Sequence, residues 1–404
     1  MFGTHIQIHG KREDLMKRFK LLMLIGLVTA LAFGLPGCSG GGGGSDSGAA
    51  NPAGNSDSDG DGIPNSDDTL PNDDTRFAAF TRILLDTLDG VFSTGVDIND
   101  NDQVVGLADD GTSIKGVRWA VDADAGTAGA PAVLAPIGEN DYSAAYGNND
   151  TGVAVGESEK DGSDFVAVLW GAGETTPAEL SLSGGFGPTS AAYAINNEGQ
   201  IVGEALTDSG LVAVLWNAGG ADPVSLGTLG GAFSAAYHIS DNGLIVGEAE
   251  LENGNTSAVV WMVDATGAIT HGPIALGTAG DDFISSIAFG VDNFGRVSGE
   301  SETADGEIHA TLWTLDPATL VPSEIADLGV AGADSSAYAV NESGRIAGWD
   351  GRDGVSLASV WDTRNTSLVD LILEEGSFSQ AYGLNEQNLT VGVSAGQAFV
   401  AVPQ

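Results

Sequence analysis

The 404-residue sequence predicts an all-β fold, and three observations support this prediction. One short phrase recurs seven times, at intervals of 44 to 52 residues, through to the C-terminus. Each copy holds two short apolar runs joined by a turn signal, which is typical of a β-hairpin. A second short sequence lies between consecutive copies, and a similar sequence also precedes the first copy. Repeats of this length and kind predict a seven-bladed β-propeller of four-stranded blades.

The hairpin of each copy is marked by a glycine that closes the second apolar run. These marker glycines are Gly106, Gly156, Gly203, Gly247, Gly299, Gly348 and Gly392. Seven residues before each marker stands a polar turn residue: Asn99, Asn149, Asn196, Ser240, Asp292, Asn341 or Asn385. A residue type that tolerates a left-handed backbone follows three positions later. Because the offset never varies, we expect seven hairpins of one geometry.

The strand before each turn alternates between small and bulky residues. Six positions before the turn residue the sequence has Ser93, Ser143, Ser190, Ser234, Ser286, Ser335 and Ser379. Three positions before it stand Val96, Tyr146, Tyr193, Tyr237, Phe289, Tyr338 and Tyr382. We expect the bulky face of one blade to pack against the small face of the next. The serines are expected to bond to the backbone of a neighbouring blade, with a polar ring at the channel mouth as the alternative.

A third strand carries a tryptophan 13 or 14 residues after the marker in six copies: Trp119, Trp170, Trp216, Trp261, Trp313 and Trp361. One residue type at one repeat position indicates core packing rather than a ligand site. Fourth strands are expected at 223–229 and 324–330 in the better-formed copies. Each unit therefore holds four strands.

The two ends of the chain predict how the ring closes. The last repeat stops after its third strand, AFVAV at 398–402. Its missing fourth-strand phrase is found before the first repeat, where LDTLDGVFS (85–93) parallels LGTLGGAFS (226–234). We expect the N-terminal and C-terminal strands to pair and close the propeller, which leaves no open sheet edge. The alternative is an open solenoid.

The repeat resembles the HAF-type extracellular repeat. The matching stretches are LGTLGG at 226–231, SAAYAIN at 190–196, GQIVGEA at 199–205 and HATLW at 309–313. The His-Ala-Phe signature is degraded, since residues 165–170 read FVAVLW and residues 397–399 read QAF. The resemblance covers about 77–404 and implies an exported or surface protein. It supplies no catalytic residues.

The first 37 residues predict a signal peptide. A basic segment, Lys17-Arg18-Phe19-Lys20, precedes about fifteen apolar residues at 21–35, which is short for a membrane span. The segment ends in Leu35-Pro36-Gly37-Cys38, which resembles a bacterial lipobox although Pro36 is unusual there. We expect translation to start at Met16. The alternatives are a cleaved secretory peptide without lipid and an uncleaved anchor.

Cys38 is the only cysteine, so a disulfide within the chain is excluded. The lipoprotein resemblance implies cleavage before Cys38 and lipidation of its sulfur. Ser39 next to it implies sorting to an outer membrane, with display on the periplasmic side or at the surface. Residues 38–56 then read as the lipidated cysteine and a Gly/Ser-rich tether.

An acidic segment at 57–74 predicts a calcium-binding loop. Carboxylates at alternate positions followed by a glycine can supply the oxygen ligands that Ca²⁺ requires. The predicted calcium ligands are Asp57, Asp59, Asp61, the backbone carbonyl of Ile63, Asn65 and Asp68. The segment resembles a single thrombospondin type 3 repeat, although Leu70-Pro71 stands where the animal repeat has Cys-Pro. The alternative is a solvated acidic linker before the propeller at 77–404.

The charge of the chain restricts its partners. The formal net charge is −42 at pH 7 with only 14 Lys and Arg, which excludes nucleic acid as a partner. The loops between second and third strands are rich in acids, among them Glu157, Glu248 and Glu300, and we expect one strongly negative face. Such a face suits divalent cations, a cationic polymer or a basic protein. Solvation of exposed loops is the alternative.

No catalytic constellation is visible in the sequence. The histidines after the leader, His238, His271 and His309, lie in unrelated parts of their repeats. We therefore expect a lipid-anchored module that binds a protein or glycan ligand at the cell envelope. The alternatives are a glycan-active hydrolase or lyase that uses rim carboxylates such as Glu300 or Asp282, and a scaffold within an outer-membrane complex.

Overall fold

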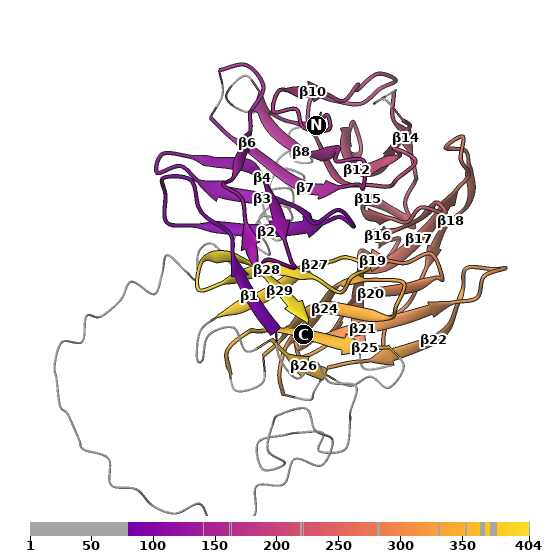
Figure 1. The fold of residues 1–404 in the computed structure, drawn as a ribbon. Helices are drawn as coiled ribbons and strands as arrows, with labels where there is room; N and C mark the ends of the chain where they lie inside the picture. The colour runs from indigo at the N-terminus through magenta and orange to yellow at the C-terminus, as the bar shows by residue number, and fades with distance from the viewer. Residues whose placement is uncertain are drawn as a thin grey trace, which may run out of the picture. The chain divides into compact units, whose positions relative to one another are not determined.

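The computed structural model describes residues 80–403, except 140, 161, 163, 219, 221, 281–282, 330–331, 352–353, 364–367 and 372–377. All regular structure in this part of the chain is β-strand, arranged in seven antiparallel sheets. The innermost strands surround a common centre and the remaining strands of each sheet extend outward (Figure 1). The predicted seven-bladed β-propeller is confirmed.

Blades 1 to 7 are numbered by their innermost strands, which are β2 (Ser93–Ile98), β7 (Ser143–Asn148), β11 (Ser190–Ile195), β15 (Gly230–Ile239), β19 (Phe283–Val291), β23 (Ser335–Val340) and β27 (Ser379–Leu384). The second strands are β3 (Gln103–Asp109), β8 (Ala154–Lys160), β12 (Ile201–Thr207), β16 (Leu244–Leu251), β20 (Arg296–Thr303), β24 (Arg345–Asp350) and β28 (Thr390–Ser394).

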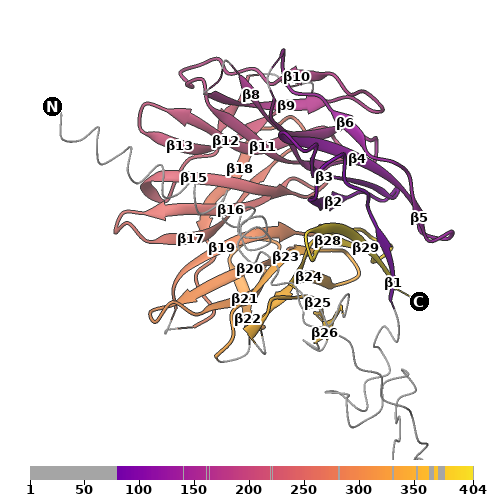
Figure 2. The same ribbon diagram turned by 90° about the vertical axis from the view of Figure 1, so that its left-hand side faces the viewer.

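The third strands are β4 (Ile114–Asp122), β9 (Asp164–Trp170), β13 (Gly210–Trp216), β17 (Thr256–Val263), β21 (Ile308–Leu315), β25 (Leu357–Asp362) and β29 (Gln397–Pro403). The outermost strands are β6 (Ala132–Leu134), β10 (Pro177–Glu179), β14 (Val224–Ser225), β18 (Ile269–Ala275), β22 (Pro322–Asp327), β26 (Leu368–Asp370) and β1 (Phe80–Leu84). In blade 1 a further short strand, β5 (Thr127–Ala128), also pairs with β4. The side-on view of the same strands is given in Figure 2.

Blade 7 joins the two ends of the described chain. Its strand order is β1-β29-β28-β27, so β1 is its outermost strand and β29 the third. Beyond β1, the backbone N–H of Leu85 donates to the carbonyl of Ala398 at 2.9 Å. The expected closure by N-terminal and C-terminal strands is confirmed. The strand itself lies just ahead of the repeated phrase at 85–93, which forms the connection to blade 1.

The marker glycine is required by a close backbone approach inside every blade. A Cβ atom on Gly203 would lie 1.9 Å from the carbonyl oxygen of Ala191 on the innermost strand. The corresponding distance is 1.9–2.0 Å at all seven markers. The cause is a β-bulge, because the innermost strand shifts its register against the second strand at this level in each blade.

The seven repeat serines of the innermost strands join neighbouring blades. Each Oγ accepts a backbone N–H from the third strand of the preceding blade at 2.8–3.0 Å. The donors to Ser93, Ser143, Ser190, Ser234, Ser286, Ser335 and Ser379 are Ala398, Gly116, Ala167, Ala213, Ala258, Ala310 and Ala358. The expectation of hydroxyl-to-backbone bonds between blades is confirmed.

The turns at the other end of the innermost strands are also linked. Asn99 Nδ2 donates to the carbonyl of Asn149 at 2.8 Å, and Asn385 returns the series to Asn99 at 3.2 Å. Where Asp292 replaces asparagine, Arg296 Nη2 donates to the carbonyl of Asn341 instead, at 3.3 Å. These bonds fix the hairpins around the centre.

The hydrophobic core lies in layers between adjacent blades. One layer combines Val202 and Leu215 of blade 3 with Ile245 and Trp261 of blade 4. All six repeat tryptophans are fully buried, and in blade 7 the buried Ala401 stands at the same register position. The prediction that these tryptophans form the core is confirmed.

Candidate functional site

Two of the sequence-predicted sites cannot be compared with the structure. The lipidation residue Cys38 lies outside the described residues, as does the whole leader. The predicted calcium ligands Asp57, Asp59, Asp61, Ile63, Asn65 and Asp68 also lie outside them. The signal-peptide, tether and calcium predictions therefore stay predictions. Within residues 80–403 as described, no helix meets the length and apolarity that a membrane span needs.

Three acids that the sequence assigned to exposed loops are instead on strands. Glu157, Glu248 and Glu300 lie on β8, β16 and β20, and each directly follows a marker glycine. Glu157 and Glu300 are buried, with 5% and 7% of their surface exposed. Glu204 holds the same position on β12 and was missed, although the second apolar run of four consecutive repeats is followed by a Gly-Glu pair in the sequence.

The aromatic residues of the innermost strands do not pack as period-two alternation predicted. Each lies at the β-bulge, outside the regular pairing of its strand. A bulge redirects the side chain of its extra residue. The rings contact one another from blade to blade, with centroid separations of 5.2–5.9 Å through Tyr146, Tyr193, Tyr237, Phe289, Tyr338 and Tyr382. The bulge therefore builds a girdle of rings along the innermost strands.

In blades 2, 3 and 4 the girdle is bonded to the glutamates. The hydroxyl of Tyr146 donates to Glu157 Oε1 at 2.9 Å, and that of Tyr193 to Glu204 Oε1 at 3.0 Å. The Tyr237 hydroxyl donates to Glu248 Oε1 at 2.5 Å. We call Tyr146, Tyr193, Tyr237, Glu157, Glu204, Glu248 and Glu300 the tyrosine–glutamate arc.

Blade 5 carries the glutamate of the arc without the phenol. Phe289 stands at the tyrosine position, so no hydroxyl from that ring reaches Glu300. Burial, followed by the charges of Glu248, Glu302 and Asp334, raises the pKa of Glu300 to about 7, while the Ser336 hydroxyl lowers it. Ser336 is fully buried, and its Oγ has no partner of regular hydrogen-bond geometry among the described residues.

The arc is one-sided. At the position of its glutamates, blades 1, 6 and 7 have Leu107, Trp349 and Val393. Carboxylates thus occupy four adjacent blades, and apolar side chains occupy the other three. The glutamates also act across blades. Burial, followed by the charges of Glu204 in the same blade and Glu157 in the preceding blade, raises the pKa of Tyr193 well above its usual value.

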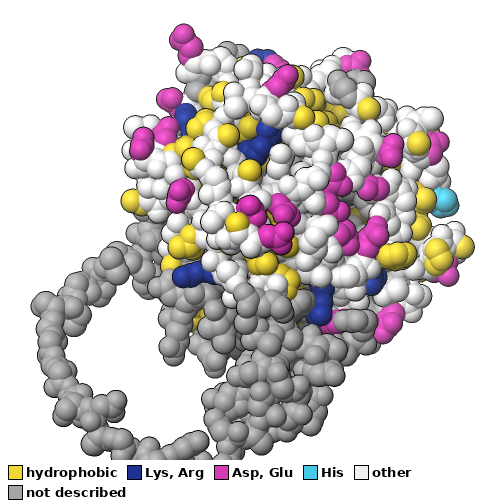
Figure 3. Space-filling model, viewed as in Figure 1, with side chains coloured by type: hydrophobic (Ala, Val, Ile, Leu, Met, Phe, Trp, Pro, Cys, Tyr) yellow, Lys and Arg dark blue, Asp and Glu magenta, His cyan; other side chains and the backbone are white. Residues whose placement is uncertain are grey.

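The turn end of the innermost strands carries a second set of acids. Asp100 N donates to Asp150 Oδ1 at 2.8 Å, and Glu386 N donates to Asp100 Oδ1 at 2.9 Å. Partial burial and then neighbouring carboxylates raise the pKa of Asp100. Because these side chains cap backbone N–H groups of adjacent turns, their role is structural. Figure 3 shows Asp and Glu side chains gathered around the middle of the face in view.

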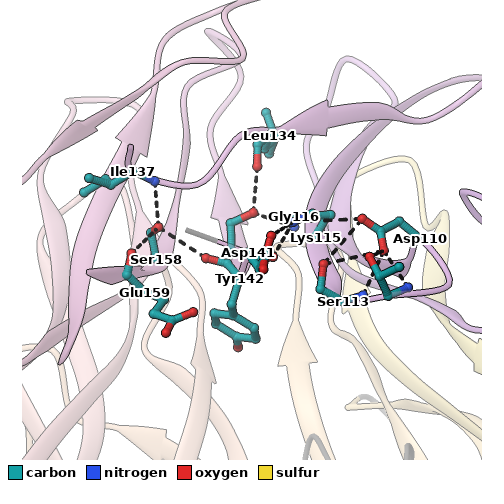
Figure 4. Close-up of polar contacts among 12 residues, drawn as sticks. Asp110, Ser113, Lys115, Gly116, Leu134, Ile137, Asp141, Tyr142, Ser158 and Glu159 are labelled. Atoms are coloured by element: carbon teal, nitrogen blue, oxygen red, sulfur yellow. Dashed lines mark hydrogen bonds and ion pairs between the residues drawn. The ribbon is translucent and has the colours of Figure 1, made fainter. Parts of the chain in front are cut away.

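The rim between blades 1 and 2 is held by a few polar contacts (Figure 4). Lys115 lies 3.9 Å from carboxylate oxygens of both Asp110 and Asp141, and its Nζ also donates to the carbonyl of Asp141. Ser158 Oγ accepts the N–H of Ile137 at 2.9 Å. Lys115 thus offsets part of the negative charge of the predicted rim here. Asp161, Asp281, Asp282, Glu374 and Glu375 of the predicted rim lie outside the described residues.

The three histidines stay apart. His309 Nδ1 lies 2.9 Å from Asp327 Oδ2, and its Nε2 is 3.8 Å from Glu307. His238 is enclosed between blades 4 and 5, and burial lowers its pKa to about 4. His271 is exposed on β18. In the part of the chain that the structure describes, no three His, Cys, Asp or Glu side chains are placed to hold a metal ion.

No protein-family model and no curated protein matches this chain. Among solved structures, it is similar to a puromycin-hydrolyzing peptidase of Mycobacterium tuberculosis, with 14% identity and a TM-score of 0.52 over 75% of this chain and 50% of that one. A puromycin hydrolase gives 15% identity and a TM-score of 0.50 over 78% and 52%. A structure from a study of two prolyl endopeptidases gives 13% and 0.51 over 78% and 47%.

The chain thus matches about half the length of these enzymes. At such low identity the likeness shows the fold alone. The chain belongs to the β-propellers by architecture, and its site must be interpreted from its own residues.

Proposed function

We propose that this protein is a lipid-anchored β-propeller that binds a partner at the bacterial cell envelope. The observation that carries the proposal is the tyrosine–glutamate arc. Glu157 and Glu300 are buried, and burying a carboxylate costs free energy, whereas three other blades fill the same position with apolar residues. Four acids in adjacent blades are therefore better explained by a ligand than by folding.

The cellular location in this proposal is based on the N-terminal signal-peptide-like segment. The lipobox-like segment ending in Cys38 and the Gly/Ser-rich stretch after it would place the propeller at a membrane surface on a flexible tether. The calcium-type loop at 57–74 would stiffen the chain next to the propeller when Ca²⁺ is bound. Metabolic labelling with a radioactive fatty acid tests the anchor, since Cys38→Ser should abolish incorporation.

Partner capture from detergent-solubilised membranes tests the binding function. The intact lipoprotein should retain a defined protein or glycan, and a Glu204→Gln/Glu248→Gln double variant should lose it. Captures with and without Ca²⁺ show whether the loop contributes. Equal recovery by the wild type and the double variant would contradict a binding role for the arc.

A glycan-active enzyme is the second candidate, because one observation favours it. A pKa of about 7 at Glu300 is in the range that suits a general acid, and other carboxylates lie near it. This candidate requires turnover of a glycan by the wild type that Glu300→Gln abolishes. Absence of any product across a panel of envelope glycans would exclude it in favour of the binding module.

A further inference from the structure

We propose that the tyrosine–glutamate arc binds the side chain of an arginine on a partner polypeptide. The inference rests on the proposed binding function and adds the chemistry of the ligand. Three properties of the arc support it: its charge, its aromatic wall and the unequal bonding of its glutamates.

The charge of the arc selects a cation. Four glutamates lie at one level of four adjacent blades, and neither Glu157 nor Glu300 forms an ion pair with a described Lys, Arg or His. Carboxylates lose hydrogen bonds to water when they are buried. A cation that enters between them would replace these bonds by charge-assisted hydrogen bonds, which are stronger than neutral ones. An anionic or neutral ligand would not balance the negative charges of Glu157 and Glu300.

The aromatic wall selects a flat cation over a small spherical one. The rings of Tyr193, Tyr237 and Phe289 contact each other in series beside the glutamates. A guanidinium group can lie against such rings and still direct its N–H groups at carboxylates. Because the described acids form no cluster suited to a metal ion, their spacing across separate blades fits a delocalised cation better.

The unequal bonding marks where the cation would sit. In blades 2 to 4 a phenol occupies one oxygen of each glutamate. In blade 5 Phe289 provides no such donor, and the buried Ser336 hydroxyl beside Glu300 lies outside regular hydrogen-bond geometry. A guanidinium donating to Glu300 and Glu248 would complete the pattern that the three other blades already have. Phe289 would supply the apolar surface beneath it.

The other blades have apolar side chains at the position of the arc glutamates, and this favours a peptide ligand over a free amino acid. Trp349, which is half-buried on β24, continues the wall with an apolar side chain in blade 6, whereas Val393 in blade 7 is fully buried. Trp349 Nε1 donates to the Tyr338 hydroxyl at 3.1 Å, which holds the indole at the arc's edge. A residue adjacent to the arginine in a chain could pack against this surface, whereas a lone guanidinium compound could not use it.

Fluorescence anisotropy with the full-length lipoprotein in detergent tests the inference. The probe is a labelled peptide with one arginine between a leucine and a glycine, and the reference is the same peptide with citrulline, a neutral isostere. We expect the arginine peptide to bind at least about tenfold more tightly than the citrulline peptide. Glu300→Gln and Glu248→Gln should each weaken arginine binding by about tenfold. Added salt should weaken it as well.

Two variants make the test specific. Glu324→Gln removes one charge from the outermost strand of the same blade and should leave affinity unchanged. Phe289→Tyr gives blade 5 the phenol of blades 2 to 4, which would compete for Glu300 and weaken binding. Thermal unfolding of each variant shows that it folds. Equal affinity for arginine and citrulline, or no effect of the arc variants, would overturn the inference.

Failure of this inference differs from failure of the proposed function. If the arginine peptide does not bind up to about 1 mM while a membrane partner is still captured through the arc, the ligand chemistry is wrong and the binding function stands. If agmatine binds as tightly as the peptide, the ligand is a free guanidinium compound and the polypeptide assignment is overturned.

Discussion

The backbone N–H of Ala398 donates to Ser93 Oγ at 3.0 Å, joining residues 305 positions apart in the sequence. The same bond recurs between every pair of adjacent blades, but only this one links the start of the propeller to its end. Closure thus uses the contact that joins the other blades. Blade 7 adds the pairing of β1 with β29, which brings the two ends of the described chain into one sheet.

Deleting residues 80–85 should destabilise the whole propeller. The deletion removes β1 with the buried side chains of Ile83 and Leu85, and losing a buried aliphatic side chain costs about 2–5 kcal/mol. It also exposes the edge of β29 to other chains. Denaturant unfolding should show a lower midpoint, and size exclusion should show aggregates. A deletion of 45–50 in the tether is the control, and equal stability of both deletions would contradict a closed ring.

Ser335→Ala should lower the free energy of unfolding by about 1–3 kcal/mol. The change leaves the buried N–H of Ala310 on the neighbouring blade without its acceptor, since that N–H donates to Ser335 Oγ at 2.9 Å. Ser323→Ala on the exposed outermost strand of blade 5 should cost less than about 0.5 kcal/mol. Urea denaturation of the two variants measures both values. Similar losses would argue against a special role for the serine.

Gly203→Ala should be among the most damaging single substitutions. The new Cβ would lie 1.9 Å from the carbonyl oxygen of Ala191, so the bulge in blade 3 would have to shift. Overpacking of this kind costs about 1–3 kcal/mol and often more. Gly129→Ala is the control, because its nearest atom would be 3.6 Å away. Melting temperatures should separate the two variants clearly, and indistinguishable values would refute the steric explanation.

Glu300→Gln should remove part of the pH dependence of stability. The pKa of Glu300 is raised from 4.5 to about 7 in the folded protein, so the folded state binds more protons than the unfolded state between these values. Its contribution therefore falls as pH rises from about 4.5 to about 7, by on the order of 3 kcal/mol. The glutamine variant should match the wild type near pH 5 and exceed it at pH 8.

The measurement for Glu300 is the difference in free energy of unfolding at several pH values. Using the difference cancels other titrating groups, such as Asp97, whose pKa burial raises to about 6. It also cancels His238, whose lowered pKa acts in the opposite direction. A difference that stays constant with pH would contradict the assigned shift.

Calcium should bind the mature protein through its acidic loop. Calorimetric titration is expected to show one site in the wild type and none after the double change Asp59→Ala/Asp61→Ala, because alternate carboxylates supply the oxygens. Asp73→Ala/Asp74→Ala removes the same charge outside the predicted ligands and should keep the site. Equal uptake by both double variants would show that Ca²⁺ is held by general charge.

The number of blades could be predicted from the sequence because each marker glycine stands where a neighbouring backbone carbonyl leaves no room for a Cβ atom. The close approach of Gly203 to Ala191 recurs in every blade, so its residue type and spacing repeat without variation. The serines and tryptophans were assigned correctly for the same reason. Each occupies an environment that recurs in every blade, and the same environment requires the same residue type at the same repeat position.

The candidate site was only partly predictable. Period-two alternation predicted that Tyr193 lies on one face of its strand, and it assigned no role to Glu204. In the structure the bulge turns the tyrosine so that its hydroxyl reaches Glu204. The bulge leaves no clear signal in the strand itself, since its one extra residue looks like ordinary alternation. Glu300 was placed in a loop because its strand, β20, extends further than the apolar pattern does.

By itself the sequence determined the count of blades, the closing of the ring and the residues that must be small or polar at each level. These follow from local rules of turn, pairing and packing that act the same way in every repeat. Only the tertiary structure decided which side chains meet at the centre. Closing seven similar sheets into a circle brings Glu248 and Glu300 of adjacent blades together, and that proximity depends on the curvature of the whole ring rather than on any stretch of chain.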